Sequence, residues 1–197
     1  GLQPLFQAYV GISFLTTLLV LYLGYRWDVP NTITGIHAAV SLWTGIATIN
    51  YTTGWVSPEN TIFLDWIVTT PLLILSLALT AGHGDFVKPK DTLYAVAGQV
   101  AVIIAGYLSV QTGQQAYFWV GSLIFAGVMY TVVAKIGDMS DSSFKVTSIL
   151  FFTLWLGYPV LVYLGLLNDT ISMRTLEIGL VVLPLLSKHV YGLLDMA

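Results

Sequence analysis

The sequence predicts a bundle of seven membrane-spanning α-helices, and three observations lead to that prediction. The chain has 197 residues, of which 56% are hydrophobic and only 9% are charged, whereas soluble domains carry about 25% charged residues. Apolar runs of about 20 residues, the length that crosses a bilayer, recur along the whole chain. Short polar segments rich in turn-forming residues separate these runs. We therefore expect an all-α membrane protein with a single domain over residues 1–197.

Seven segments have the length and composition of spanning helices, with ends defined to about three residues. They comprise residues 4–24, 32–53, 61–81, 91–110, 116–136, 144–166 and 174–196. The short connections make consecutive helices antiparallel neighbours in one bundle. A soluble helical bundle, the alternative, would need a polar stripe on every helix, and segments such as LTTLLVLYLG and LVVLPLL lack one.

The basic residues predict the orientation in the membrane. The loops after the first, third and fifth segments hold Arg26, Lys88, Lys90, Lys135 and Lys145. The loops at the other end hold only Arg174. Because cytoplasmic loops carry the excess of lysine and arginine, we expect an extracellular N-terminus and a cytoplasmic C-terminus.

Composition also argues against several classes of function. The chain has no cysteine, which excludes disulfides and thiol chemistry. Basic clusters are absent, so the sequence does not favour nucleic-acid binding. The first apolar run lacks a basic leader and a small-residue cleavage site, and we therefore expect no cleavable signal peptide. We find neither a nucleophile–base–acid triad nor a metal-ligand cluster, and we expect no enzyme.

The last segment carries the residue around which the functional prediction is built. Lys188 lies deep in an otherwise apolar run, and a lysine at the centre of a spanning helix costs roughly 2.5–3.5 kcal/mol on insertion scales. Such residues usually face the bundle interior and carry function. A buried amine can form a Schiff base with a carbonyl compound. The alternative is a lysine that snorkels from a helix end, but Leu193, Leu194 and Met196 continue the apolar run beyond it.

Asp65 is the predicted partner of this lysine. A lone carboxylate in the membrane is also expensive unless it pairs with a cation. Asp65 lies in the outer part of the third segment, after the apolar residues Ile62, Phe63 and Leu64. The alternative is an aspartate that caps a helix beginning a few residues later.

Other residues of the third and sixth segments could line a pocket. Pro71 has no N–H to donate, and the neighbouring Thr69 and Thr70 could satisfy freed backbone groups or face a ligand. Trp66, Trp155 and Tyr158 lie away from the interfacial belts where such aromatics usually occur. Flat aromatic walls would suit a long conjugated ligand, although on spacing alone ordinary core packing is the better explanation.

A second polar pair is expected toward the cytoplasmic end. Asp195 follows Lys188 by seven residues, nearly two helical turns and about 10 Å along the axis. His37, early in the second segment, lies at the same predicted depth, and a histidine exchanges protons near neutral pH. The two could share a proton, or they could be two solvated end residues. His83 and His189 carry no comparable signal.

Together these motifs resemble one known family. The strings DWIVTTPLLILS, WLGYP and LPLLSK are similar to those of the microbial rhodopsins, and the resemblance covers all seven helices. It implies all-trans retinal bound as a protonated Schiff base on Lys188, with Asp65 as the counterion and Thr69 close to the Schiff base. It further implies a retinal pocket lined by Trp66, Thr70, Leu73, Trp155, Tyr158 and Pro184.

Departures from the family pattern point to a branch. Outward proton pumps usually carry a carboxylate four residues before the lysine, where this chain has Pro184, and another where it has Ser76. An arginine is usual at Ile62 and a tryptophan at Val162. The proline and the string SKHVYGLLDM resemble the xenorhodopsins and the related sensory rhodopsin of cyanobacteria.

The resemblance implies a light-driven inward proton pump in which His37 and Asp195 form the cytoplasmic proton acceptor. A photosensory rhodopsin that signals through a soluble transducer is the alternative, and a transporter independent of retinal is a third possibility. The expected partners are the lipid bilayer, protons and, by resemblance, further copies of the chain in a trimer.

Overall fold

The computed structural model describes residues 2–139 and 142–197. Within this part of the chain, seven helices are long and apolar enough to cross a membrane. Their ends lie within three residues of the predicted segments, and no strand is present among the described residues. The predicted all-α, seven-helix fold is therefore confirmed.

The first four spans are single helices, and the last three contain π-helical turns. The elements are α1 Gln3–Arg26, α2 Asn31–Thr53, α3 Pro58–Thr80, α4 Pro89–Thr112, α5 Gln115–Tyr130, η1 Thr131–Ile136, η2 Gly137–Met139, α6 Ser142–Trp155, α7 Gly157–Leu161, η3 Val162–Leu167, α8 Met173–Pro184, η4 Leu185–Val190 and α9 Tyr191–Met196. The fifth span comprises α5 and η1, the sixth α6, α7 and η3, and the seventh α8, η4 and α9.

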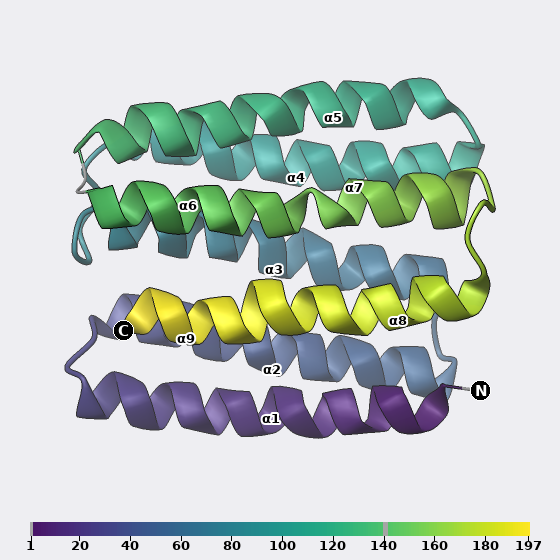
Figure 1. Ribbon diagram of the computed structural model, residues 1–197, viewed down its shortest axis with the longest axis horizontal. Coiled ribbons are helices and arrows are strands. Elements are labelled where there is room, and N and C mark those ends of the chain that lie inside the picture. Colours follow the sequence, from purple (N-terminus) through teal and green to yellow (C-terminus); the bar gives the residue numbers. More distant parts are fainter. Residues whose placement is uncertain (1, 140–141) are drawn as a thin grey trace.

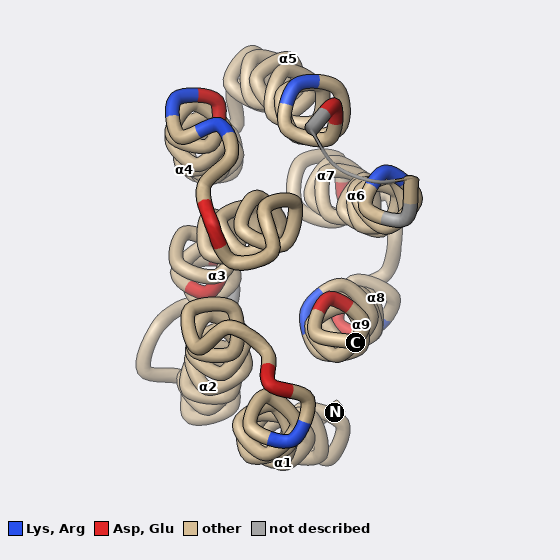
Figure 2. Tube along the Cα trace, turned by 90° about the vertical axis from the view of Figure 1, so that its left-hand side faces the viewer, with Lys and Arg blue, Asp and Glu red and all other residues tan. Residues whose placement is uncertain are grey.

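The helices run side by side, and the two termini lie at opposite ends of the bundle (Figure 1). In end view the seventh span lies across from α1, α2 and α3 (Figure 2), and it contacts α1 and α2 as well as α6 and α7. We call the end that holds the C-terminus the inner end and the opposite end the outer end. The sequence predicts that the inner end is cytoplasmic.

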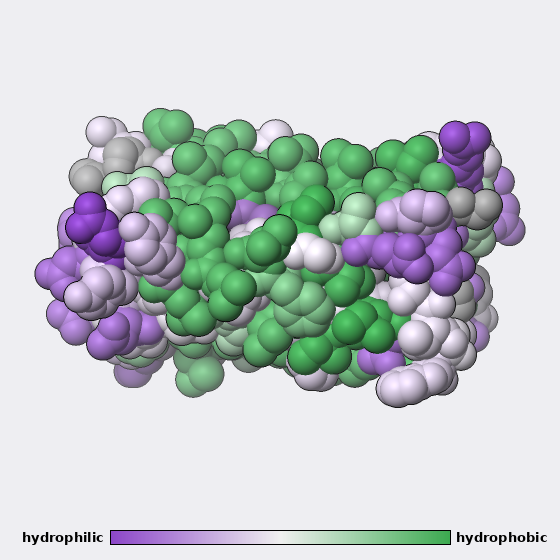
Figure 3. Space-filling view, turned by 90° about the horizontal axis from the view of Figure 1, so that it is seen from below, coloured by the Kyte–Doolittle hydropathy of each residue, from purple (hydrophilic) through white to green (hydrophobic). Residues whose placement is uncertain are grey.

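The surface has the distribution of polarity that a bilayer requires. Hydrophobic side chains cover the middle of the visible face, and hydrophilic side chains gather toward its two ends (Figure 3). Many large apolar side chains are exposed on the outside of the bundle, among them Leu15, Leu123 and Val146. Together with the seven spans, this surface identifies a multi-pass membrane protein.

The turn between α2 and α3 sets the depth of Asp65. Gly54 ends α2 with a φ of 72°, in the left-handed region that glycine adopts without a Cβ penalty. The Ser57 side chain then caps α3 by accepting a hydrogen bond from the backbone N–H of Asn60 at 3.4 Å. Asp65 is therefore about two turns inside α3 and does not cap it.

The seventh span changes its helical geometry just before the lysine. Pro184 ends α8 and cannot donate a backbone hydrogen bond, and the π-helical turn η4 follows immediately. Such turns often occur at functional sites inside α-helices. Here the turn carries Lys188 and His189, and both are 2% exposed.

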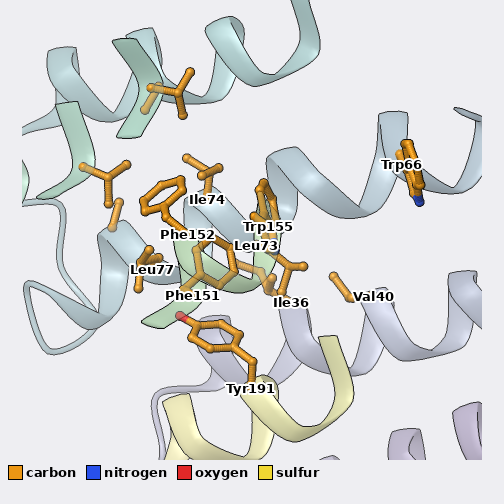
Figure 4. Packing of buried hydrophobic residues seen from close by; sticks show 14 of the residues in the cluster. Ile36, Val40, Trp66, Leu73, Ile74, Leu77, Phe151, Phe152, Trp155 and Tyr191 are labelled. Carbon is orange, nitrogen blue, oxygen red and sulfur yellow. The ribbon is translucent and has the colours of Figure 1, made fainter. Parts of the chain in front are cut away.

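The inner half of the bundle has a tightly packed apolar core (Figure 4). Phe151 lies between the rings of Trp155 and Tyr191, with centroid distances of 4.3 and 4.5 Å. Leu73 and Leu77 of α3 complete this cluster, and both are 0% exposed. These side chains therefore form an apolar layer at this depth.

Replacing Phe151 with alanine should reveal how much this core contributes to stability. We expect Phe151→Ala to lower the free energy of unfolding by about 3–5 kcal/mol, because it leaves a cavity that its neighbours cannot fill. The neighbouring Leu150, which is 50% exposed, provides the control variant Leu150→Ala. Unfolding in mixed detergent micelles measures both, and equal losses would contradict the packing described here.

Candidate functional site

Lys188 and Asp65 form a buried ion pair. The Lys188 Nζ atom lies 2.5 Å from Asp65 Oδ2, and the two side chains are only 1% and 12% exposed. The pair joins η4 of the seventh span to α3, as the sequence predicts. The structure excludes both simpler alternatives, because the lysine does not reach a helix end and the aspartate does not cap a helix.

Two threonine hydroxyls complete the surroundings of the amine. Lys188 Nζ donates to Thr69 Oγ1 at 2.9 Å and to Thr44 Oγ1 at 3.4 Å, and Thr44 in turn donates to Asp65 Oδ1 at 3.1 Å. The three N–H groups of the ammonium are thus all used. Thr69 was expected here. Thr44 was not, because a single threonine in an apolar segment carries no distinctive signal.

A cavity of about 580 Å³ is lined by Trp66, the residue that follows Asp65 in α3. Its lining residues are Phe63, Trp66, Thr70, Gln99, Val102, Ile103, Gly106, Phe118, Gly121, Ser122, Phe125, Trp155, Tyr158, Pro159 and Val162. The Trp66 and Tyr158 rings meet with a centroid distance of 4.8 Å, and the Tyr158 hydroxyl is hydrogen-bonded to Ser187 Oγ at 2.7 Å. Because Ser187 precedes Lys188, the wall of this cavity adjoins the lysine.

This cavity has the apolar, aromatic lining that a conjugated chain requires. Aromatic side chains and small residues dominate its lining, and such walls bury flat apolar ligands. Of the six residues predicted to line a retinal pocket, Trp66, Thr70, Trp155 and Tyr158 line this cavity. Leu73 is fully buried in the same apolar cluster as Trp66 and Tyr158. Residues from α4 and α5, such as Gln99 and Phe125, were missed, because only the folded bundle brings those helices to this site.

A second cavity, of about 410 Å³, extends from the ion pair toward the outer end. It is lined by Phe6, Tyr9, Ala47, Thr48, Tyr51, Thr61, Ile62, Asp65, Trp66, Leu180 and Pro184. The predicted pocket residue Pro184 therefore faces this outer cavity. Ile62 also lines it, at the position where the resembling family usually has an arginine. Asp65 of the ion pair thus borders this outer cavity.

His37 and Asp195 meet at the inner end of the bundle. His37 Nε2 lies 2.7 Å from Asp195 Oδ2, and the side chains are 1% and 0% exposed. Ser76 Oγ donates to Asp195 Oδ2 at 2.8 Å and lies 2.9 Å from His37 Nε2. The two residues are therefore buried, and the alternative of solvated end residues is excluded. A Cβ atom on Gly192 would come within 2.9 Å of His37 Nδ1, so the glycine makes room for the histidine ring.

His189 is a buried polar residue whose surroundings the sequence did not reveal. Its Nε2 and Nδ1 atoms lie 3.2 Å from Ser13 Oγ and from Ser41 Oγ. Ser13 already donates to the Tyr9 carbonyl at 2.9 Å, so we assign the histidine proton to Nε2 and the donor role to Ser41. His189 therefore ties the seventh span to α1 and α2 beside Lys188.

Comparison with known proteins gives the family. The profile described as bacteriorhodopsin-like protein matches residues 1–197. The chain belongs to the bacteriorhodopsin-like family. Microbial rhodopsins are light-driven ion pumps or photoreceptors rather than enzymes, and they bind retinal through a Schiff base to a lysine.

Both pumps and sensors are similar to this microbial rhodopsin. Sensory rhodopsin-2 of Haloarcula vallismortis is 31% identical over 144 residues, which cover 67% of this chain and 59% of the relative. The crystal structure of the inward H⁺ pump xenorhodopsin has a TM-score of 0.91 and 30% identity, covering 100% of this chain and 92% of that one. Halorhodopsin, a light-driven chloride pump, has a TM-score of 0.87 but 18% identity, covering 99% of this chain and 93% of that chain, and shows the shared fold alone.

The ion pair should dominate the stability of the retinal-free protein. We expect Asp65→Asn to lower the free energy of unfolding by about 3–5 kcal/mol, because it leaves a buried ammonium without its partner. Adding Lys188→Met should restore stability to within about 1 kcal/mol of the starting protein. Unfolding titrations of the single and double variants measure this coupling. A double variant as unstable as the sum of both singles would contradict it.

Proposed function

We propose that this microbial rhodopsin is a light-driven inward proton pump that carries all-trans retinal on Lys188. The observation that carries the proposal is the buried cluster of His37, Asp195 and Ser76, which can accept a proton at the inner end. The likeness to the inward H⁺ pump xenorhodopsin, with 30% identity over the whole chain, supports the same direction. The fit of the cavity beside Lys188 to an apolar conjugated chain supports the choice of cofactor.

Retinal, when joined to Lys188 Nζ, supplies the absorption of light and the isomerisation that changes the surroundings of that nitrogen. A Schiff base at Lys188 would keep one proton on the nitrogen, and Asp65 would be the charged acceptor for it. Thr44 holds Asp65 Oδ1 through its own hydrogen bond.

The inner cluster provides the acceptor for this proton. Asp195 and His37 together offer a carboxylate and an imidazole, and either group can bind a proton. Ser76 stabilises the carboxylate by donating to it, but its hydroxyl cannot supply a proton to the lysine nitrogen at neutral pH. The chain therefore has a group that accepts protons at its inner end, and Ser76 replaces the carboxylate that would return them from that side.

The resting packing separates the two polar sites. Leu73 lies between Thr69 and Ser76 along α3 and is 0% exposed, and the apolar core around Phe151 surrounds it. Asp65, by contrast, adjoins the outer cavity. Inward transport requires the nitrogen to lose its proton across the apolar layer and to regain one from the outer side.

A sensory function is the second candidate, and the sensory rhodopsins among the relatives favour it. The matched region spans only 59% of the length of the Haloarcula vallismortis relative. A sensor would use the same chromophore but would need a soluble or membrane-bound transducer. Light would then change the contacts with that transducer without moving a net proton.

Recording pH in cells that express the protein with retinal tests the proposal. Inward pumping should raise the pH of the medium on illumination, and a protonophore should abolish the change. Acidification of the medium, or no change of pH in protein that has a full photocycle, would overturn the inward direction. Light-dependent binding of a transducer in that case would favour the sensor.

Asp195→Asn tests the inner acceptor separately. We expect proton release at the inner end to slow about tenfold or more, because the cluster loses its carboxylate. The exposed Asp138 lies at the same end of the bundle, and Asp138→Asn removes the same charge outside the cluster. Flash spectroscopy with a pH indicator dye measures the release, and equal behaviour of the two variants would exclude Asp195 from the path.

A further inference from the structure

A second carboxylate, Glu177, is hydrogen-bonded to the wall of the outer cavity. Tyr51 lines this cavity together with Asp65, and its hydroxyl donates to Glu177 Oε1 at 3.1 Å. Glu177 lies in α8, one turn outward from the lining residue Leu180. Glu177 is therefore linked to Tyr51 by a hydrogen bond, and Tyr51 and Asp65 line the same cavity.

The cavity has the size and polarity to hold water. The centres of water molecules can occupy about 40 Å³ of it, and a single water needs roughly 10–15 Å³ on this measure. The buried Tyr9 hydroxyl lines the cavity and has no partner among the described residues. Thr48 and Thr61 each donate their hydroxyl proton to a backbone carbonyl, so their oxygens remain free to accept hydrogen bonds. Water bridging these groups would connect Tyr51 to Asp65.

Glu177 has the exposure that a proton-collecting group requires. Both Glu177 and Tyr51 are partly buried, so the carboxylate is in contact with the outer medium and with the cavity wall. The charged groups near this pair are Glu59 of α3, which acts on the Tyr51 hydroxyl, and Arg174, which is exposed one turn earlier in α8. The cavity itself contains no basic side chain that would repel an incoming proton.

We infer that Glu177 is the residue that takes up protons at the outer end and passes them through Tyr51 and cavity water toward Asp65 and Lys188. The inference rests on the proposed function, because an inward pump resupplies the lysine nitrogen from this side. This role of Glu177 would also give the chain a proton path at the outer end that needs no arginine at position 62, where the chain has Ile62. The simpler reading is a clamp in which the Tyr51–Glu177 hydrogen bond holds α2 against α8.

The variant Glu177→Gln distinguishes proton uptake by Glu177 from a purely structural clamp between α2 and α8. The glutamine keeps an oxygen that accepts the Tyr51 hydrogen bond, so a clamp survives, but it loses the group that binds and releases a proton. In retinal-reconstituted protein, flash spectroscopy follows how fast the Lys188 nitrogen loses and regains its proton. We expect Glu177→Gln to regain the proton about tenfold more slowly or worse, with the loss step unchanged. Tyr51→Phe should slow the same step.

A matched control and a chemical rescue complete the experiment. Asp169, exposed in the loop before α8, provides Asp169→Asn, which removes one negative charge from the same end and should leave the rate unchanged. A small membrane-permeant weak acid such as hydrazoic acid should restore the rate in Glu177→Gln, because it carries protons into the cavity directly. Recovery in Glu177→Gln as fast as in Asp169→Asn would overturn the role of Glu177.

Transport measured separately distinguishes the two proposals. If wild-type vesicles show no inward transport but Glu177→Gln still slows recovery of the proton, the pumping direction fails and the role of Glu177 stands. If inward transport is present and Glu177→Gln recovers normally, only the role of Glu177 fails. A wild-type protein whose Lys188 nitrogen keeps its proton after the flash would overturn both.

Discussion

The buried ion pair between Lys188 and Asp65 is the constraint on which the rest of this structure depends. Two opposite charges inside a membrane protein are tolerated only when they meet and their remaining hydrogen-bonding capacity is used. Thr44 and Thr69 supply that capacity, and the π-helical turn after Pro184 presents the lysine to α3. The pair therefore fixes how α2, α3 and the seventh span approach one another at mid-depth.

The charges in the apolar segments made much of this arrangement predictable. Lys188, Asp65 and Asp195 are conspicuous because a charge in a spanning helix is costly, and helical periodicity places Asp195 on the face of the lysine. The spans themselves follow from length and composition. What the sequence could supply was thus the depth of each charged group and the partner each would need.

Neutral polar groups and cavities were less predictable for a physical reason. Thr44 and His189 cost far less to bury than a charge, so their presence in an apolar segment does not reveal a partner. His189 is hydrogen-bonded to Ser13 of α1 and Ser41 of α2, and only the folded bundle brings those helices together. The outer cavity likewise results from the packing of side chains from four helices.

The asymmetry around the lysine connects the fold to a direction of transport. On its outer side Asp65 borders a cavity that leads toward Tyr51 and Glu177. On its inner side Leu73 and the aromatic core separate it from Ser76, His37 and Asp195. Under the proposed function, a proton that crosses this apolar layer after light absorption would reach a cluster that can hold it. Its replacement would come from the side of the outer cavity, so the arrangement supports the proposed movement from the outer end to the inner end.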